Sequence, residues 1–141
     1  MRRLLSAAAV LLLAACSGDP AGSGTTDVMV RTDRSEYDRG AIGEVPVTFT
    51  VANHTSGPIS LLWCGSGAIA ELQLLNDGEW MTTSPPFCPS IYSPVEVAPG
   101  ASAGGVVFAP GPAGTYRLRV QYGAPGFQAA RYGVSPIFRV R

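Results

Sequence analysis

Few side chains in this sequence are suited to catalysis. His54 is the only histidine among 141 residues, and it lies in the turn-like stretch NHTSG. A nucleophilic side chain that is activated by a general base needs that base, most often a histidine, within hydrogen-bond reach. His54 is either a base or ligand on a loop or a solvated turn residue, and its small polar neighbours favour the solvated turn. The stretch CGSGA, from Cys64 onward, does not match the G-x-S-x-G elbow of serine hydrolases. These residues do not predict an enzyme.

The acidic residues do not form a recognisable site either. Asp33, Glu36 and Asp38 are close in sequence, and their oxygens suit calcium, but their spacing lacks the ligand series of an EF-hand loop. A solvated turn is therefore favoured over a calcium site. No glycine-rich phosphate loop occurs. The sequence predicts no cofactor and no metal.

The first 15 residues have the pattern of an export signal. Residues 1–3 are Met-Arg-Arg, and residues 4–15 are apolar or small. Such a run is too short to span a bilayer as a helix, which takes about 20 apolar residues. A basic start followed by a short apolar stretch and small residues is typical of a secretory signal peptide.

Residues 13–16, Leu-Ala-Ala-Cys, resemble the lipobox of bacterial lipoproteins. The resemblance implies that the Cys16 thiol receives diacylglycerol, that residues 1–15 are removed, and that the new amino terminus is acylated, with palmitate as a typical chain. An ordinary signal peptide beside an incidental cysteine remains the alternative. Two acyl chains anchor a protein stably where one is marginal. Ser17 implies the outer membrane if the organism has two membranes.

The remaining chain is long enough for one domain. Without residues 1–15 it has 126 residues, with eight arginines, no lysine and ten Asp or Glu. This mild acidity does not favour nucleic-acid binding. Residues 16–27 are rich in Gly, Ser and Pro, so we interpret them as the lipidated cysteine and a flexible tether. Residues 28–141 form the predicted domain.

Cys64 and Cys88 remain after Cys16 is assigned to the lipid. An exported protein meets oxidising conditions, so this pair is predicted to form a disulfide. A metal site of the two cysteines with His54 is the alternative, but the close spacing of metal ligands is missing.

Apolar residues alternate with polar ones along several short stretches separated by Gly, Pro and Asn. A period of two predicts β-strands, and seven to nine short antiparallel strands in one domain predict an all-β sandwich. The clearest strands are residues 44–53 and 114–122, and Asn76-Asp77-Gly78 predicts a hairpin turn. The residues expected to point inward in the two clearest strands are Val45, Val47, Phe49, Val51, Tyr116, Leu118, Val120 and Tyr122.

Residues 33–59 and 97–122 resemble the immunoglobulin-like, or fibronectin type III-like, domains of bacterial envelope lipoproteins. The shared features are a Tyr-x-x-Gly turn, an alternating strand that ends in Asn, a Pro-Gly turn and a Gly-x-Tyr-Arg strand start. The resemblance implies that Tyr116 forms a tyrosine corner and that Trp63 is the buried tryptophan. Leu118 stands where antibody domains have a cysteine, so the disulfide that joins the two sheets of those domains is not expected. A Cys64–Cys88 bond would hold a peripheral loop in place.

Two surface features are candidate ligand sites. Alternation places four arginines on the outward face of two strands, where they form a strip suited to carboxylate or phosphate groups. The strip consists of Arg117, Arg119, Arg139 and Arg141. Neutralisation by Glu71 or Glu79 is the alternative. The second feature is a predicted loop over residues 123–133 with Phe127 among small residues, which either recognises a partner or packs over the sandwich end near His54.

These observations together predict an exported, lipid-anchored, non-catalytic protein of the cell envelope. Its expected role is a binding or envelope-assembly module, and its expected partners are the membrane, through the lipid, and an envelope protein or polysaccharide. The alternative is a secreted domain that resembles a protease inhibitor, and an enzyme is the third option.

Overall fold

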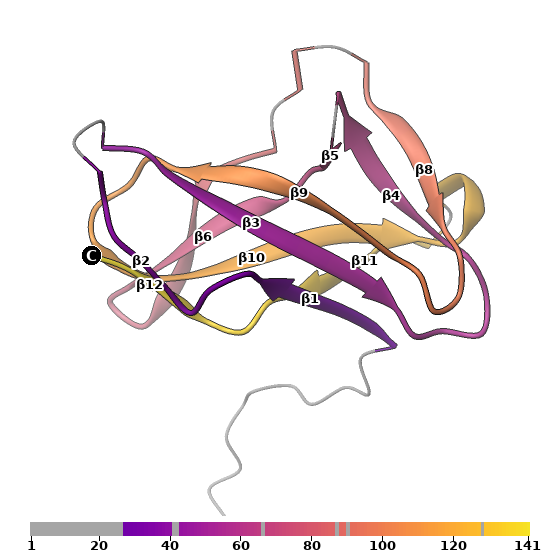
Figure 1. Ribbon diagram of the computed structural model, residues 1–141, viewed down its shortest axis with the longest axis horizontal. Coiled ribbons are helices and arrows are strands. Elements are labelled where there is room, and N and C mark those ends of the chain that lie inside the picture. The colour runs from indigo at the N-terminus through magenta and orange to yellow at the C-terminus, as the bar shows by residue number, and fades with distance from the viewer. Residues whose placement is uncertain (1–26, 41–42, 66, 87, 90, 128) are drawn as a thin grey trace, which may run out of the picture.

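The computed structural model describes residues 27–40, 43–65, 67–86, 88–89, 91–127 and 129–141. These residues form two packed layers of β-strands, with β3 and β9 running across the front of Figure 1 and β10 behind them. Cys16, the predicted signal peptide and nearly all of the predicted tether lie outside the described residues. Within the described part of the chain, no helix is long and apolar enough to cross a membrane.

The smaller sheet has the strand order β1-β3-β9, and the larger sheet is built around β10. One short 3-10 helix, η1 (Pro125–Phe127), follows β10. The strands are β1 (Val28–Thr32), β2 (Glu36–Tyr37), β3 (Val45–Asn53), β4 (Ile59–Cys64), β5 (Gly67–Ala68), β6 (Glu71–Asn76), β7 (Glu79–Ser84), β8 (Ser93–Val97), β9 (Ser102–Ala109), β10 (Gly114–Gly123), β11 (Arg131–Val134) and β12 (Phe138–Val140).

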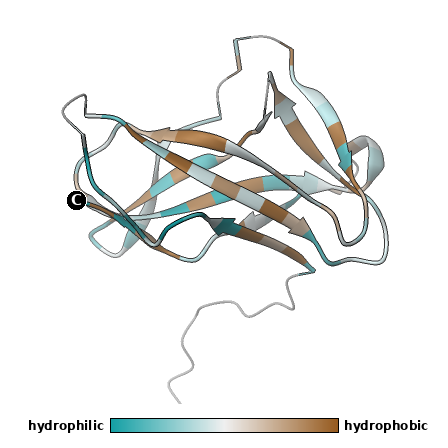
Figure 2. Ribbon diagram, in the orientation of Figure 1, coloured by the Kyte–Doolittle hydropathy of each residue, from teal (hydrophilic) through white to brown (hydrophobic). Residues whose placement is uncertain are grey.

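The alternating sequence of β3 produces the alternation in its burial. Val45, Val47, Phe49 and Val51 are buried, and the residues between them face solvent. Figure 2 shows this alternation as brown and paler bands along β3. The inward side chains of β3 pack against those of β10, so the core lies between the two sheets. The inward pattern predicted for β3 is confirmed.

β10 is the central strand of the larger sheet and pairs with β4, β6, β11 and β12. Tyr116, Leu118 and Val120 on this strand are buried. The Tyr116 hydroxyl donates a hydrogen bond to the carbonyl oxygen of Pro112, 2.5 Å away, and the ring stacks on Phe138. This bond to the backbone just upstream is the geometry of a tyrosine corner.

β1 lies in the smaller sheet, where it pairs with β3, and β2 lies in the larger sheet, where it pairs with β12. The chain therefore crosses from one sheet to the other between these two strands. The layers, the repeated crossings and the tyrosine corner define an immunoglobulin-like β-sandwich. The β2–β12 pairing is parallel, whereas every strand was expected to be antiparallel. It is parallel because β2 continues in the direction of β1 after the crossing. The described residues contain twelve strands rather than seven to nine, since β2 and β5 are two-residue pieces and β11 was not predicted.

On one side, β10 pairs with both β6 and β4, and a protruding hairpin separates these two pairings. Arg119 pairs with Glu71 and Tyr122 pairs with Leu61, so three steps along β10 match ten steps along the neighbouring chain. The excess residues fold back as the β4–β5 hairpin, in which Cys64 pairs with Gly67. The predicted disulfide between Cys64 and Cys88 is present, and it fastens this hairpin to the segment after β7.

Candidate functional site: the outer face of the larger sheet

Four neighbouring strands, β7, β6, β10 and β11, present their outward side chains on one face. The strand registers place Thr82 opposite Gln73, Gln73 opposite Arg117, and Gln121 opposite Tyr132. We call this surface the arginine face. Its central members are Glu71, Gln73, Trp80, Thr82, Arg117, Arg119 and Tyr132.

Arg119 is neutralised on this face. Its Nη2 and Nε donate to Oε2 of Glu71 at 2.7 and 3.1 Å, and its guanidinium lies 4.4 Å from the ring centroid of Tyr132. The alternative raised for the arginine strip, neutralisation by Glu71, therefore applies to Arg119. Two donors on one carboxylate and an aromatic ring together restrict the side chain to one orientation.

Arg117 is held differently, without a carboxylate. Its Nε donates to Oε1 of Gln73 at 2.8 Å, and its guanidinium lies 4.1 Å from the ring centroid of Trp80. The ion pairs among the described residues do not include Arg117, and Glu79 forms none of them. The positive charge of Arg117 is therefore positioned but not cancelled by a direct partner.

A continuous hydrogen-bonded row joins the two arginines. Gln73, which is almost fully buried, accepts from Arg117 and donates through Nε2 to Oε1 of Glu71 at 2.7 Å. The Thr82 hydroxyl also donates to Oε1 of Glu71. Each amide and carboxylate oxygen of this row has a defined donor, so the protein's own contacts fix the orientation of both arginines.

The local environment shifts two pKa values. Burial by itself would raise the pKa of Glu71, but hydrogen bonds from Thr82, Arg119 and Gln73 outweigh it, and the net pKa is lowered. Burial lowers the pKa of Arg117, and the nearby charge of Arg119 lowers it further. Both groups remain charged at neutral pH, because a carboxylate with a lowered pKa is ionised and arginine is always protonated.

The other two arginines of the predicted strip lie on or just after β12, between β10 and β2. Arg141 forms an ion pair with Glu36 at 2.5 Å, while Arg139 is exposed and takes part in no ion pair of the described residues. Arg139 pairs across the sheet with Thr115, two residues before Arg117. The strip therefore contains two neutralised arginines and two, Arg117 and Arg139, without a carboxylate partner.

The loop predicted over residues 123–133 is shorter than expected. Arg131–Val134 form β11, which pairs with β10, so the connection spans residues 124–130. Phe127 is half-buried in η1, which packs against β4 and β8, so its ring is not an exposed tip. The prediction of an eleven-residue loop was wrong, because the long strand β10 offers a pairing edge that residues 131–134 occupy.

His54 is exposed at the end of the smaller sheet. Its backbone N–H donates to the carbonyl oxygen of Asp27, and its side chain borders a shallow hollow with Met29 and Arg31. Neither cysteine lines this hollow, and Cys64 and Cys88 are bonded to each other. The alternative metal site of His54 with two thiolates is therefore excluded.

The acidic turn does not assemble a cation site. Asp33 accepts a hydrogen bond from the Tyr37 hydroxyl at 2.5 Å, and Glu36 is paired with Arg141. Burial raises the pKa of Tyr37 to about 12, and the bond to Asp33 adds to the rise. Across the described ranges, no three His, Cys, Asp or Glu side chains gather as metal ligands.

Trp63 is half-buried on β4 and packs against the core, and its Nε1 donates to the carbonyl oxygen of Gly65. Leu61 is fully buried on this strand, whereas Trp63 is not. Trp80 and Tyr132, the aromatic members of the arginine face, were not recognised in the sequence. The hairpin turn after Asn76 contained the signal for Trp80, because its register sets Trp80 opposite Leu75 on the outward side.

No protein-family model and no curated protein matches the sequence. Solved structures with similar folds include a structural-genomics target protein, at 10% identity and a TM-score of 0.49, with 80% of this chain and 84% of that one covered. The putative ApaA protein from Bordetella pertussis is 14% identical, with a TM-score of 0.45 and coverages of 79% and 87%. The ASH/PapD-like domain of human CEP192 is 11% identical, with a TM-score of 0.37 and coverages of 96% and 97%. At these identities nothing about activity or partners transfers to this chain.

Proposed function

We propose that the protein is an exported, lipid-anchored and non-catalytic binding module of the cell envelope. The anchoring part of the proposal rests on the Leu-Ala-Ala-Cys motif that ends at Cys16. The binding part rests on Arg117, whose charge is held in place by Gln73 and Trp80 without a carboxylate partner.

The geometry of the arginine face favours a ligand with acceptor oxygens. The Nη1 and Nη2 groups of Arg117 take part in no hydrogen bond among the described residues, so they remain donors for a carboxylate or phosphate. Because the guanidinium is already oriented, a ligand pays little of the entropy of ordering it. The partner is an envelope protein or polysaccharide that carries such groups.

The anchor is tested by labelling cells with palmitate and comparing the protein with its Cys16→Ser variant. We expect label in the protein and none in the variant, which should also leave the membrane fraction. Equal distribution of the two forms, with no label in either, would remove the envelope role.

The binding surface is tested by sedimentation of the purified full chain with isolated cell-envelope material. Arg117→Gln should weaken binding about tenfold, the loss that follows when one charged hydrogen bond is removed. Arg34→Gln is the matched control, because Arg34 is an exposed arginine outside the arginine face. Equal binding by both variants and the unmodified protein would contradict a role for the arginine face.

A further inference from the structure

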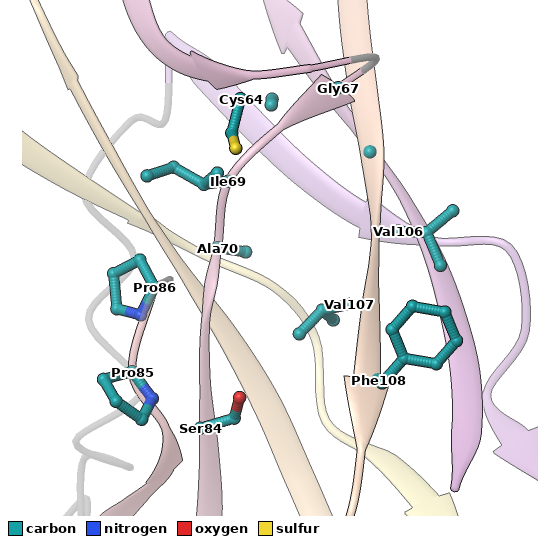
Figure 3. Close-up of a pocket in the computed structure, with 12 residues that line it drawn as sticks. Cys64, Gly67, Ile69, Ala70, Ser84, Pro85, Pro86, Val106, Val107 and Phe108 are labelled. Carbon is teal, nitrogen blue, oxygen red and sulfur yellow. The ribbon is translucent and has the colours of Figure 1, made fainter. Parts of the chain in front are cut away.

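A second surface, where β9 of the smaller sheet faces residues of the larger sheet, has the features of a docking site for a polypeptide strand. A groove of about 590 Å³ runs along β9. Figure 3 shows Val107 on the groove side of β9, with Pro85 and Pro86 at the opposite wall beyond β5 and β6. The lining residues, which include Cys64 and Ile69, are all uncharged.

The backbone of β9 faces this groove with unpaired groups. β9 pairs only with β3 among the described strands. In an antiparallel pair every second residue bonds to the partner strand, and the bond from the Asn53 N–H to the Ala101 carbonyl shows which residues these are. The odd-numbered residues of β9 therefore bond to β3, and the N–H and C=O groups of Val106 and Phe108 point to the other edge of the strand. No strand pairing among the described residues uses these groups.

The missing neighbour has a structural cause. β8 directly precedes β9 in the chain, but it pairs with β4 in the larger sheet. The β4–β5 hairpin approaches β9 only at its middle, where a Cβ atom on Gly105 would lie 2.2 Å from the carbonyl oxygen of Ala68. The smaller sheet therefore ends at β9 with one strand position vacant beside Val106 and Phe108.

The free edge lacks the features that normally prevent pairing. Edge strands are usually protected by charged residues, prolines or bulges. β9, with the sequence SAGGVVFA, contains no charged residue and no proline, and Val106 and Phe108 are 52% and 54% exposed. An unprotected edge of this kind favours the addition of a strand.

We infer that this groove binds an extended, uncharged segment of a partner polypeptide, which adds to the smaller sheet as a strand beside β9. The unpaired N–H and C=O groups require a partner with a backbone of its own, and the uncharged lining selects an uncharged segment. The other wall of the groove is formed by β5 with Pro85 and Pro86, so a bound segment would have protein on both sides. The β9 edge of a second folded copy carries β3 on its other side, so it would enter the groove as part of a sheet and not as a single extended segment.

The first test measures amide hydrogen exchange by NMR in the full chain. The Val106 and Phe108 amides should exchange quickly, whereas the Val107 amide, which bonds to β3, should be protected. The probe is a capped hexapeptide of alternating threonine and valine, N-methylated at every second amide so that it presents one hydrogen-bonding edge. Its addition should protect Val106 and Phe108, and the fully N-methylated peptide should not. Absence of protection by the first peptide would overturn the inference.

A pair of variants separates edge pairing from contact with the side chain. Val106→Pro removes the free-edge N–H without removing a bond to β3, and proline is tolerated at such edge positions. Val106→Thr keeps that N–H and the branched shape. We expect Val106→Pro to weaken peptide binding about tenfold and Val106→Thr to leave it unchanged. Equal binding by the two variants would contradict the inference.

The remaining outcomes are also distinguishable. Protection of Val106 and Phe108 that rises with protein concentration and needs no peptide would assign the edge to a second copy and overturn the partner proposed here. Arg117→Gln, on the arginine face, should bind the peptide as the unmodified protein does. The groove and the proposed function can therefore fail separately.

Discussion

The arginine face and the β9 groove differ in which chemical groups they leave unsatisfied. On the arginine face the central strands β6 and β10 have a paired neighbour on each side, and side chains such as Gln73 and Glu71 hold one another in place. Along the groove the backbone of Val106 and Phe108 is open, and the side chains around it are apolar. One surface is suited to recognising charge and the other to recognising an extended chain, because their exposed donors belong to side chains in the first case and to the main chain in the second.

Of the changes considered, removal of the disulfide should have the largest effect on the free energy of unfolding. The combined change Cys64→Ser and Cys88→Ser should lower the free energy of unfolding by about 3 kcal/mol, the value expected for a closed loop of this length. Urea unfolding measures the loss. Because the bond fastens one wall of the groove, amide exchange should rise near β5 while the arginine face keeps its chemical shifts. Chemical-shift changes of similar size in the groove and on the arginine face would show that the two surfaces are not independent.

Filling the space at Gly105 should have the next largest effect. A Cβ atom there would lie 2.2 Å from the carbonyl oxygen of Ala68, so Gly105→Ala should push the hairpin off β9 and destabilise the fold by about 2 kcal/mol. Gly57→Ala is the control, since nothing lies within 4 Å of its Cβ position. Thermal unfolding of both variants measures the difference, and equal melting temperatures would contradict the tight approach.

The smallest effect should come from the carboxylate of the arginine face. Glu71 has a lowered pKa, so it stabilises the folded state above its usual value near pH 4.5, and this stabilisation is lost as pH falls through the folded pKa. Glu71→Gln should therefore cost about 1 kcal/mol at pH 7 and less at pH 3. Glu96→Gln, at an exposed position on β8, is the control. Urea unfolding across this pH range measures both, and a loss that does not depend on pH would exclude the ion pair as its cause.

The side-chain directions of the arginine face were predictable from the sequence. Arg117 and Arg119 alternate with Tyr116 and Leu118, and a strand sends alternate side chains to opposite faces. Which carboxylate meets which arginine was not predictable. It depends on the register that sets Glu71 opposite Arg119, and that register depends on the protrusion between Leu61 and Glu71.

The groove was not predictable for a related reason. The stretch from Ser102 to Ala109 has the apolar character of a strand, but its sequence does not indicate whether another strand lies on each side. The choice of β8 to pair with β4 rather than with β9 decides this, and both pairings are compatible with the sequence of β8. Likewise Arg131–Val134 lacks a clear alternating pattern, and it forms a strand because β10 is long enough to pair with it.

The sequence by itself determined the two-layer β architecture, the inward residues of β3 and β10, and the pairing of Cys64 with Cys88, because period-two alternation and cysteine count act locally or by elimination. Only the tertiary structure decided which arginines are neutralised and that β9 has no strand paired on its second side. Both depend on pairing between segments far apart in the chain, where one added residue shifts every contact that follows.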